Sequence, residues 1–210
     1  MKTILFTGDS LTDAVRNREN DHFLGQGYVT MTAGEIGVNY PGKFRFLNRG
    51  IGGDRTVDLL ARWKKDCINL KPDYLTLLIG VNDVSHELAY QNGVSAELFE
   101  KLYRELLDMA IKENPDIKII IMTPFIMHGE LTDCYFEPFY KELLNREKII
   151  ISIAEKYGFP YINLRELTAE KCLPYAPDSY WSRDGMHPDV SGHMIIAKRL
   201  TEELIKLIEE

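Results

Sequence analysis

Short runs of apolar and β-branched residues recur along the chain, separated by longer stretches of mixed polarity. Ile4 to Phe6 is a continuous apolar run, and residues 74–79 and 117–122 are apolar and β-branched apart from Lys118. Such runs are typical of strands buried on both faces of a parallel sheet. Residues 43–47 alternate polar and apolar side chains, which predicts a half-exposed edge strand. A fifth strand is predicted at 161–162, directly after a Gly-Phe-Pro break.

The stretches between these runs carry apolar residues at spacings of three and four, which predicts amphipathic helices. Two such stripes are Leu60, Trp63, Cys67 and Leu70, and Leu98, Leu102, Leu106 and Met109. A third helix is predicted over Pro138–Tyr157, and a last one begins near Asp189 with Ala197, Leu200, Leu204 and Leu207 on one face. Alternating strands and helices predict a parallel sheet covered on both sides. We therefore expect one three-layer α/β/α doubly wound domain over residues 1–210, with a five-stranded, mainly parallel sheet.

The composition of the chain limits which binding partners and which cellular location we expect. The chain of 210 residues is 45% hydrophobic and carries a formal net charge of −7, so a polyanion such as nucleic acid would be repelled. No apolar run approaches the roughly 20 residues that span a bilayer, and the N-terminal run is too short for a secretion signal. The three cysteines, Cys67, Cys134 and Cys172, form no CxxC pair, which indicates reduced packing residues. We expect a cytoplasmic protein without nucleic-acid or membrane partners, and leave open whether identical copies assemble.

The segments that follow the predicted strands share a chemistry. Gly8–Leu11, Asn48–Asp54 and Gly80–Asp83 follow the first three strands, and Asp184–Pro188 precedes the last helix. Ligands of a doubly wound sheet bind beyond the carboxyl ends of its strands, so we expect these distant segments to meet at one rim. They carry a serine, a histidine, a carboxylate and hydrogen-bond donors, which are the parts of a nucleophilic site.

The serine, histidine and aspartate of these segments can form a catalytic triad. Ser10 is a weak nucleophile until an imidazole accepts its proton, and His187 can accept it if a carboxylate orients the ring. Asp184 lies three residues before His187, with a glycine between them that permits a tight turn. A tetrahedral intermediate then requires donors for its oxyanion. The available donors are the backbone N–H groups of Ser10 and Gly53 and the side-chain amide of Asn82.

These four segments, in this order, resemble the four sequence blocks of the SGNH, or GDSL, hydrolase family: the GDS, glycine, GxND and DxxH blocks. The resemblance covers most of the chain and implies a flavodoxin-like hydrolase fold that uses no cofactor and no metal. It implies a nucleophile at Ser10 whose base, His187, is oriented by Asp184. It also implies an oxyanion hole formed by Ser10, Gly53 and Asn82.

Within this family the chain resembles bacterial cytosolic acetyl-xylooligosaccharide esterases, in stretches such as 24–29, 61–63 and 79–84. The resemblance implies a serine esterase that removes acetyl groups from imported oligosaccharides through an acyl-enzyme. One position departs from that group. Trp181 precedes Asp184 by three residues, whereas in that group the tryptophan directly precedes the aspartate, so the residues of the substrate rim stay open.

Other roles for these residues are open at this point. Trp181 can line the sugar or acyl pocket or can pack, and Arg55 can reach a substrate oxygen or pair with a nearby acid. A metal site would recruit Asp9, Asp13, Asp54, Asp184 and His187, but it leaves the serine and the asparagine without roles. The rival functions are a thioesterase or lysophospholipase of the same fold, a sugar O-acyltransferase, and a carbohydrate-binding module, which would have no use for an oxyanion hole.

The remaining histidines carry no metal-ligand spacing. His193, on the last helix, is expected to pack or to cap. His22, His86 and His128 lie in loop-like stretches and are expected at the surface. We interpret Asp9, next to the serine, as a residue that holds its loop.

Overall fold

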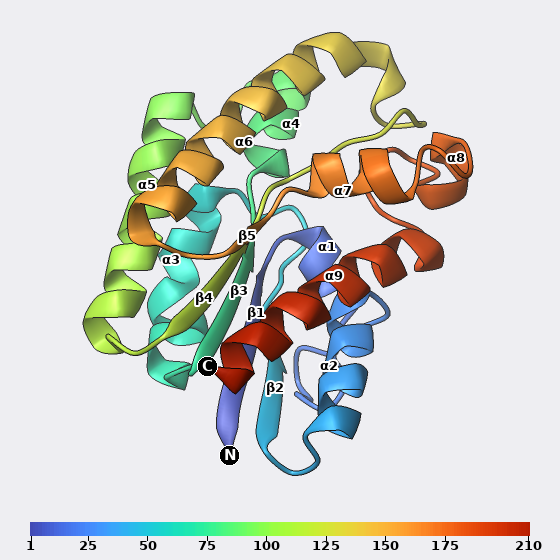
Figure 1. Cartoon of the computed structure of the whole chain (residues 1–210). Helices are drawn as coiled ribbons and strands as arrows, with labels where there is room; N and C mark the ends of the chain where they lie inside the picture. Colours follow the sequence, from blue (N-terminus) through green and yellow to red (C-terminus); the bar gives the residue numbers. More distant parts are fainter.

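The computed structural model describes all 210 residues, and a five-stranded sheet forms its centre (Figure 1). The strands are β1 (Lys2–Gly8), β2 (Phe44–Asn48), β3 (Tyr74–Leu78), β4 (Lys118–Met122) and β5 (Tyr161–Ile162). All neighbouring strands pair in parallel, in the order β2-β1-β3-β4-β5. The expected α/β class and five-stranded sheet are confirmed, and the strand order is that of flavodoxin-like folds.

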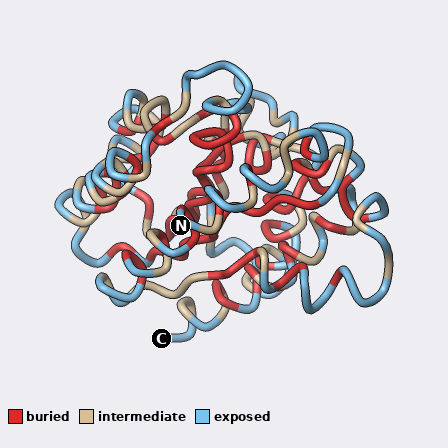
Figure 2. Tube along the Cα trace, turned by 90° about the horizontal axis from the view of Figure 1, so that it is seen from above, coloured by how far each residue is buried: buried red, intermediate tan, exposed pale blue.

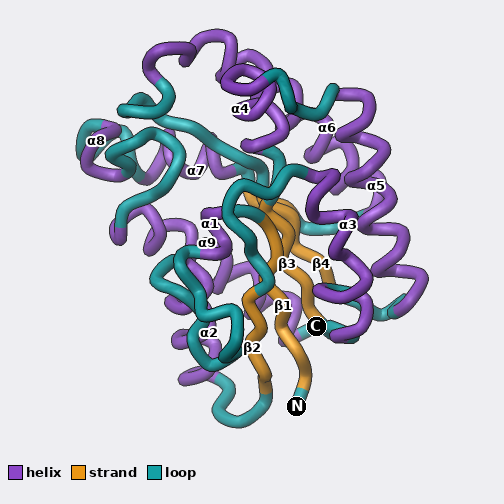
Figure 3. The backbone as a smooth tube through the Cα atoms, turned by 180° about the vertical axis from the view of Figure 1, so that it is seen from behind, coloured by secondary structure: helices purple, strands orange, loops and turns teal.

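Helices cover both faces of this sheet (Figures 1 and 3). One face carries α2 (Tyr28–Asn39), α7 (Leu164–Lys171) and α9 (Val190–Glu209). The other face carries α3 (Thr56–Asp66), α5 (Ala96–Glu113) and α6 (Phe136–Tyr157). The shorter elements are α1 (Ser10–Asp13), α4 (Val81–Tyr90), α8 (Asp178–Trp181) and the 3-10 turns η1 (Ile68–Leu70) and η2 (Asp133–Tyr135). No helix combines the length and the apolar character needed to cross a membrane.

Alternate residues of the central strands face the two helical layers. Ile4 and Phe6 of β1 pack with α2 and α9, whereas Leu5 between them packs with α3 and α5. A strand that buries both faces requires apolar residues at successive positions, which explains the unbroken apolar runs of the sequence. Seen from above, the buried residues lie along the middle of the molecule and the exposed ones along its outline (Figure 2).

The buried face of α5 differs from the expected one. Leu98 is 44% exposed, and of the expected stripe only Leu106 lies in the core. The helix instead buries Phe99, Tyr103, Leu106, Leu107 and Ala110. Two apolar stripes overlap on this helix, and the one with the aromatic residues removes more apolar area from water, so it faces the sheet.

Five helices have no counterpart among those predicted: α1, α2, α4, α7 and α8. The sequence of α2 includes two glycines and two threonines, which lower intrinsic helix propensity, and its packing against α9 stabilises it instead. His86 lies in α4 and is half-buried, so its assignment to a surface loop was wrong. Cys67 and Cys172 are buried and free, but Cys134 is exposed, so a packing role was wrong for this residue.

The strand order places a crevice beside β1. The chain passes from β1 to β2 on one side and to β3 on the other, so the order of the strands reverses between β1 and β3. Segments that leave the carboxyl ends of two such strands diverge and leave room for a ligand between them. Ser10 directly follows β1 and Asn82 follows β3, so the two lie on either side of this point.

Candidate active site

Ser10 is held at the sharp junction of β1 and α1. The side chain of Asp9 caps the helix by accepting a hydrogen bond from the backbone N–H of Leu11 at 3.1 Å, which satisfies one of the free donors of a helix start. The chain turns so closely past β3 that a Cβ on Gly8 would lie 2.0 Å from the carbonyl oxygen of Leu78. Only glycine fits there, and this turn presents Ser10 at the end of the sheet.

The loop before α9 positions His187 through local hydrogen bonds. Asp184 Oδ1 accepts the backbone N–H groups of Met186 at 2.8 Å and His187 at 2.7 Å. The hydroxyl of Ser182 donates to the carbonyl oxygen of His187 at 2.8 Å and accepts the N–H of Gly185 at 3.0 Å. The loop therefore fixes the histidine and its carboxylate as one unit.

The two segments meet in a hydrogen-bonded relay. Ser10 Oγ lies 2.9 Å from His187 Nε2, and His187 Nδ1 lies 2.7 Å from Asp184 Oδ2. Burial by itself raises the pKa of Asp184, but the N–H groups of His187 and Met186 and the imidazole ring outweigh it, so the pKa lies below its ordinary value. Asp184 is thus a carboxylate at neutral pH, and residues 177 positions apart in the sequence form one chain of polar contacts.

A glycine turn between β2 and α3 passes directly beside Ser10. The backbone N–H of Gly52 donates to Asp13 Oδ2 at 3.0 Å, and a Cβ on Gly52 would lie 3.7 Å from Ser10 Cβ. Gly53 follows with a φ of +85°, in the left-handed region that favours glycine, and it is exposed. This brings backbone N–H groups of the turn to the rim at which Ser10 lies.

Asn82 reaches the same rim from the start of α4. Its side chain is buried, and Nδ2 donates to the backbone carbonyl of Asp54, the last residue of the glycine turn, at 3.1 Å. An amide carries two hydrogens, and only one of them is used in this contact. The neighbouring Asp83 is buried as well, and its carboxylate accepts the backbone N–H and the hydroxyl of Thr56, which ties α4 to the start of α3.

A second carboxyl lies behind Ser10 in a different environment. Burial raises the pKa of Asp9 to about 7, and the charges of Asp83 and Asp54 add to the increase. Asp9 is 1% exposed and caps α1 through the N–H of Leu11, as expected for a residue that holds its loop.

A cleft of about 540 Å³ opens beside Ser10. Its lining is formed by Ser10, Leu11, Asp13, Ala14, Val15, Arg16, Arg18, Gly52, His187 and His193, of which three are hydrophobic. His193 Nδ1 accepts the backbone N–H of Tyr28 at 3.3 Å at the start of α2, and the two rings stack. Burial lowers the pKa of His193 to about 4, so this packed, capping histidine is neutral at the cleft wall.

Two residues considered for substrate contact are engaged elsewhere. Trp181 is 8% exposed and belongs to the core between the sheet and α9, where its Nε1 donates to the carbonyl of Ala176 at 3.2 Å. Arg55 donates to Asp58 through Nε at 2.8 Å and to Asn92 through Nη1. In this structure Trp181 therefore packs and Arg55 forms an ion pair, and contact of either residue with a substrate stays a prediction.

The residues considered for a metal site are distributed over separate contacts. Asp9 caps a helix, Asp13 binds the glycine turn, and Asp54 pairs with Arg62 at 2.6 Å. No group of three or more histidine, cysteine, aspartate or glutamate side chains is arranged so as to hold a metal ion.

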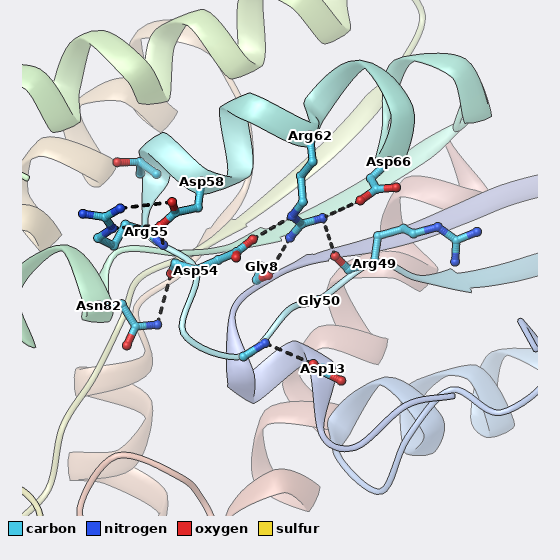
Figure 4. A network of polar contacts seen from close by, with 12 residues as sticks. Gly8, Asp13, Arg49, Gly50, Asp54, Arg55, Asp58, Arg62, Asp66 and Asn82 are labelled. Atoms are coloured by element: carbon cyan, nitrogen blue, oxygen red, sulfur yellow. Dashed lines mark hydrogen bonds and ion pairs between the residues drawn. The ribbon is translucent and has the colours of Figure 1, made fainter. Parts of the chain in front are cut away.

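Three arginines at this rim were not singled out from the sequence. Arg16 and Arg18 line the cleft, and Arg62 bonds to the backbone around the glycine turn (Figure 4). The proximity of Arg16 and Arg18 to Ser10 in the sequence was a usable signal. Arg62 lies in the stretch 61–63 that contributes to the family resemblance, but its partners are distant residues, so no sequence pattern indicated its contacts.

Comparison with known proteins identifies the family. The model of the GDSL-like lipase/acylhydrolase family matches residues 6–195, and the chain belongs to this family. It is 32% identical over 212 aligned positions to an acetylxylan esterase of Geobacillus stearothermophilus, over 96% of this chain and 93% of the relative.

Solved structures agree with this assignment. The crystal structure of Axe2, an acetylxylan esterase from Geobacillus stearothermophilus, has a TM-score of 0.83 at 31% identity and covers 96% of this chain and 93% of its own. LAE5, an alpha/beta hydrolase enzyme from the metagenome of Lake Arreo, Spain, has a TM-score of 0.83 at 26% identity, over 95% and 93% of the two chains. The expected fold and family are confirmed, and the chain is a carboxylic-ester hydrolase of the GDSL type.

Proposed function

We propose that this esterase removes acetyl groups from oligosaccharides through an acyl-enzyme on Ser10. The observation that carries the proposal is the relay from Ser10 Oγ to His187 Nε2 at 2.9 Å and from His187 Nδ1 to Asp184 Oδ2 at 2.7 Å, at the wall of an open cleft. A hydroxyl, an imidazole and an ionised carboxylate in this order define the Ser-His-Asp triad by geometry and role.

In the first half-reaction, the Ser10 hydroxyl attacks the ester carbonyl carbon while its proton passes to His187 Nε2. Asp184 holds the Nδ1 proton and stabilises the imidazolium that forms. The tetrahedral intermediate then collapses, the C–O bond to the sugar breaks, and His187 gives its proton to the departing alkoxide. A water molecule attacks the acetyl-enzyme by the same route and releases acetate.

The negative oxygen of each intermediate requires donors that are in place before the reaction. We assign this role to the backbone N–H groups of Ser10 and Gly53 and to the second hydrogen of the Asn82 amide. The left-handed backbone at Gly53 and the bond from Asn82 to Asp54 hold two of these donors at the rim. Donors fixed by the fold need no reorganisation at the moment of reaction.

The choice of substrate rests on the relatives and on the cleft. Similar structures include Axe2 variants described as an acetyl-xylooligosaccharide esterase, and two described as catalytic mutants replace a serine and a histidine. The cleft lining has three hydrophobic residues of ten, and Arg16 and Arg18 supply donors that suit sugar hydroxyls better than a long acyl chain. The cytoplasmic location and the assembly state stay predictions.

A panel of esters tests this proposal. We expect kcat/KM for p-nitrophenyl esters to peak at acetyl or propionyl and to fall by octanoyl, whereas each accommodated CH₂ would add up to roughly 0.8 kcal/mol in a true lipase pocket. Acetylated xylo-oligosaccharides should release acetate faster than lysophospholipid or acyl-CoA releases its acyl group. Ser10→Ala is the control for contaminating esterases.

Each other outcome of this panel identifies a rival. A preference for long-chain acyl-CoA or lysophospholipid would show that the enzyme is a thioesterase or a lysophospholipase and that acetylated sugars are not its substrates. Transfer of acetyl to an added sugar in place of acetate release would identify an acyltransferase. Sugar binding without any turnover would identify a binding module.

A further inference from the structure

Arg62 of α3 forms a four-way polar junction at the rim of the sheet (Figure 4). Its Nε donates to Asp54 Oδ2 at 2.6 Å, and its Nη1 donates to the carbonyl of Arg49 at 2.7 Å and to Asp66 Oδ2 at 3.2 Å. Its Nη2 donates to the carbonyl of Gly8 at 3.1 Å. The side chain of Arg62 is only 13% exposed, and those of its two carboxylate partners are 12% and 15% exposed.

Three of the four partners of this junction belong to two of the three segments that carry the proposed oxyanion donors, and the fourth, Asp66, lies in α3. Gly8 lies two positions before Ser10, and Arg49 lies at the start of the segment that leads into the glycine turn. Asp54 ends that turn, and its backbone carbonyl accepts the amide of Asn82 at 3.1 Å. One guanidinium therefore connects the end of β1, the glycine turn and, through one further hydrogen bond, the start of α4.

The chemistry of the junction is specific to arginine. A guanidinium carries five N–H donors in a rigid plane and can bind several acceptors in fixed directions. A lysine ammonium is a compact point charge on a flexible stem and cannot reproduce this geometry. Two of the acceptors are backbone carbonyls, so the contact fixes the course of the main chain in addition to the side chains.

We propose that Arg62 is the positioning residue of the oxyanion hole. It acts through Gly8 and Arg49 on the backbone donors and through Asp54 on the Asn82 amide, and it does not touch the substrate. The inference rests on the proposed function, because a hole exists only if these groups stabilise an oxyanion. Donors displaced by even about 1 Å lose much of their effect on the transition state.

A purely structural role for Arg62 makes a different prediction. If the role is purely structural, replacement of Arg62 lowers the free energy of unfolding and reduces kcat by the same factor whether or not Asn82 is present. Arg165 provides the matched control, because its guanidinium binds the buried Glu147 through two hydrogen bonds of 2.9 Å and 2.7 Å between α7 and α6. Arg165→Met therefore removes a comparable ion pair that no part of the proposed oxyanion hole uses.

The test is a double-mutant cycle between Arg62→Met and Asn82→Ala, with kcat and KM for p-nitrophenyl acetate measured well below the Tm of each variant. We expect Arg62→Met to lower kcat by about tenfold or more with KM nearly unchanged, because the lost interaction acts in the transition state. In the Asn82→Ala background the same change should cost less than about half as much on a logarithmic scale, since coupled residues are non-additive. Arg62→Lys should not restore kcat, and Arg165→Met should lower Tm but keep kcat.

The outcomes distinguish a failure of the proposed oxyanion hole from a failure of the inference about Arg62. If Asn82→Ala by itself leaves kcat unchanged, the proposed oxyanion hole fails whatever Arg62 does. If Asn82→Ala lowers kcat but Arg62→Met costs the same factor in both backgrounds, Arg62 is merely structural and only this inference is overturned. Should Arg62→Met not fold, Asp54→Asn takes its place in the cycle, because it removes the charge that Arg62 binds and keeps the backbone carbonyl.

Discussion

The two sides of Ser10 are built in different ways. On one side, His187 and Asp184 lie three residues apart, and hydrogen bonds within the 182–187 loop orient them toward one another. The backbone N–H groups of Met127 and Leu131 also hold this loop, through the carbonyl oxygens of Gly185 at 2.8 Å and Asp184 at 2.9 Å. On the other side, the contacts join residues 28 to 54 positions apart: Asn82 with Asp54, and Arg62 with Gly8. The mutual orientation of the proposed acid–base pair is thus set mainly within one loop, whereas the proposed oxyanion side depends on contacts between several segments of the sheet.

The two carboxyl groups nearest to Ser10, those of Asp184 and Asp9, lie in different surroundings and differ in their pKa values. Backbone N–H groups and an imidazole surround Asp184 and lower its pKa, although burial opposes them. Asp9 is enclosed in the interior with one N–H donor from Leu11, and burial raises its pKa to about 7. These two surroundings make Asp184 a carboxylate at neutral pH, whereas Asp9, on the interior side of Ser10, titrates near neutrality.

Loss of the acid–base unit should have the largest effect. We expect Ser10→Ala or His187→Ala to lower kcat by several orders of magnitude, up to about 10⁶, and Asp184→Asn by up to about 10⁴, because the asparagine keeps the shape of the loop but favours the wrong tautomer. Turnover of p-nitrophenyl acetate measures the loss. Unchanged thermal unfolding is the control, and near-normal turnover by purified Ser10→Ala would rule out the mechanism.

Loss of a donor on the other side should cost less. We expect Asn82→Ala to lower kcat by the equivalent of about 2.7–4 kcal/mol, the effect of a single oxyanion donor, with KM little changed. Asn92→Ala is the matched control, since this exposed asparagine binds Arg55 and not the glycine turn. A variant in which only KM rises would show that Asn82 binds the ground state, and Asn82 would then leave the proposed hole.

The contrast between contacts within a short segment and contacts between distant segments also explains which features could be predicted from the sequence. The meeting of Ser10, Asp184 and His187 could be predicted because each belongs to a short motif whose chemistry is readable within a few residues. Their catalytic roles stay part of the proposal. Strand positions could be predicted to within one or two residues, because a doubly buried strand demands an unbroken apolar run.

Features that depend on tertiary packing could not be predicted. The buried face of α5 depends on which of two overlapping apolar stripes removes more apolar surface area from water. Leu98 of the expected stripe is 44% exposed. The place of Trp181 in the core and the pairing of Arg55 with Asp58 depend on elements that only the fold brings together. Arg62 has acceptors 54, 13, 8 and 4 positions away, and no local pattern encodes such a set.

A smaller effect is expected from weakening the local loop without removing a catalytic group. Ser182→Ala deletes the hydroxyl that bridges the carbonyl of His187 and the N–H of Gly185 at 2.8 Å and 3.0 Å. Each neutral hydrogen bond contributes about 0.5–1.5 kcal/mol, so we expect kcat to fall by about tenfold. Ser191→Ala is the control, because its hydroxyl has only a long contact of 3.4 Å with Tyr180. A loss as large as that of His187→Ala would show that the remaining hydrogen bonds of the loop cannot orient His187 without Ser182.

The smallest effect on turnover, but a distinct effect on stability, is expected at the buried carboxyl behind the serine. Asp9 has a pKa of about 7 in the folded chain and about 3.9 in an unfolded one. Between these values the folded state binds a proton that the unfolded state does not, so the free energy of unfolding decreases as the pH rises through this window. Asp9→Asn keeps the acceptor for the Leu11 N–H and removes the titration.

We therefore expect the difference in free energy of unfolding between Asp9→Asn and the wild type to shift in favour of the variant by more than about 1.4 kcal/mol from pH 5 to pH 8, the equivalent of one pKa unit. Urea unfolding at the two pH values measures this shift. Asp21→Asn is the control without a shift in this window, because hydrogen bonds from Arg49 hold the pKa of Asp21 below its ordinary value. Asp21 is therefore ionised in both the folded and the unfolded state from pH 5 to pH 8, and its contribution to stability is lost only below about pH 4. Equal pH dependence in the wild type and Asp9→Asn would mean that Asp9 is ionised throughout, and the electrostatic contrast between the two sides of Ser10 would not hold.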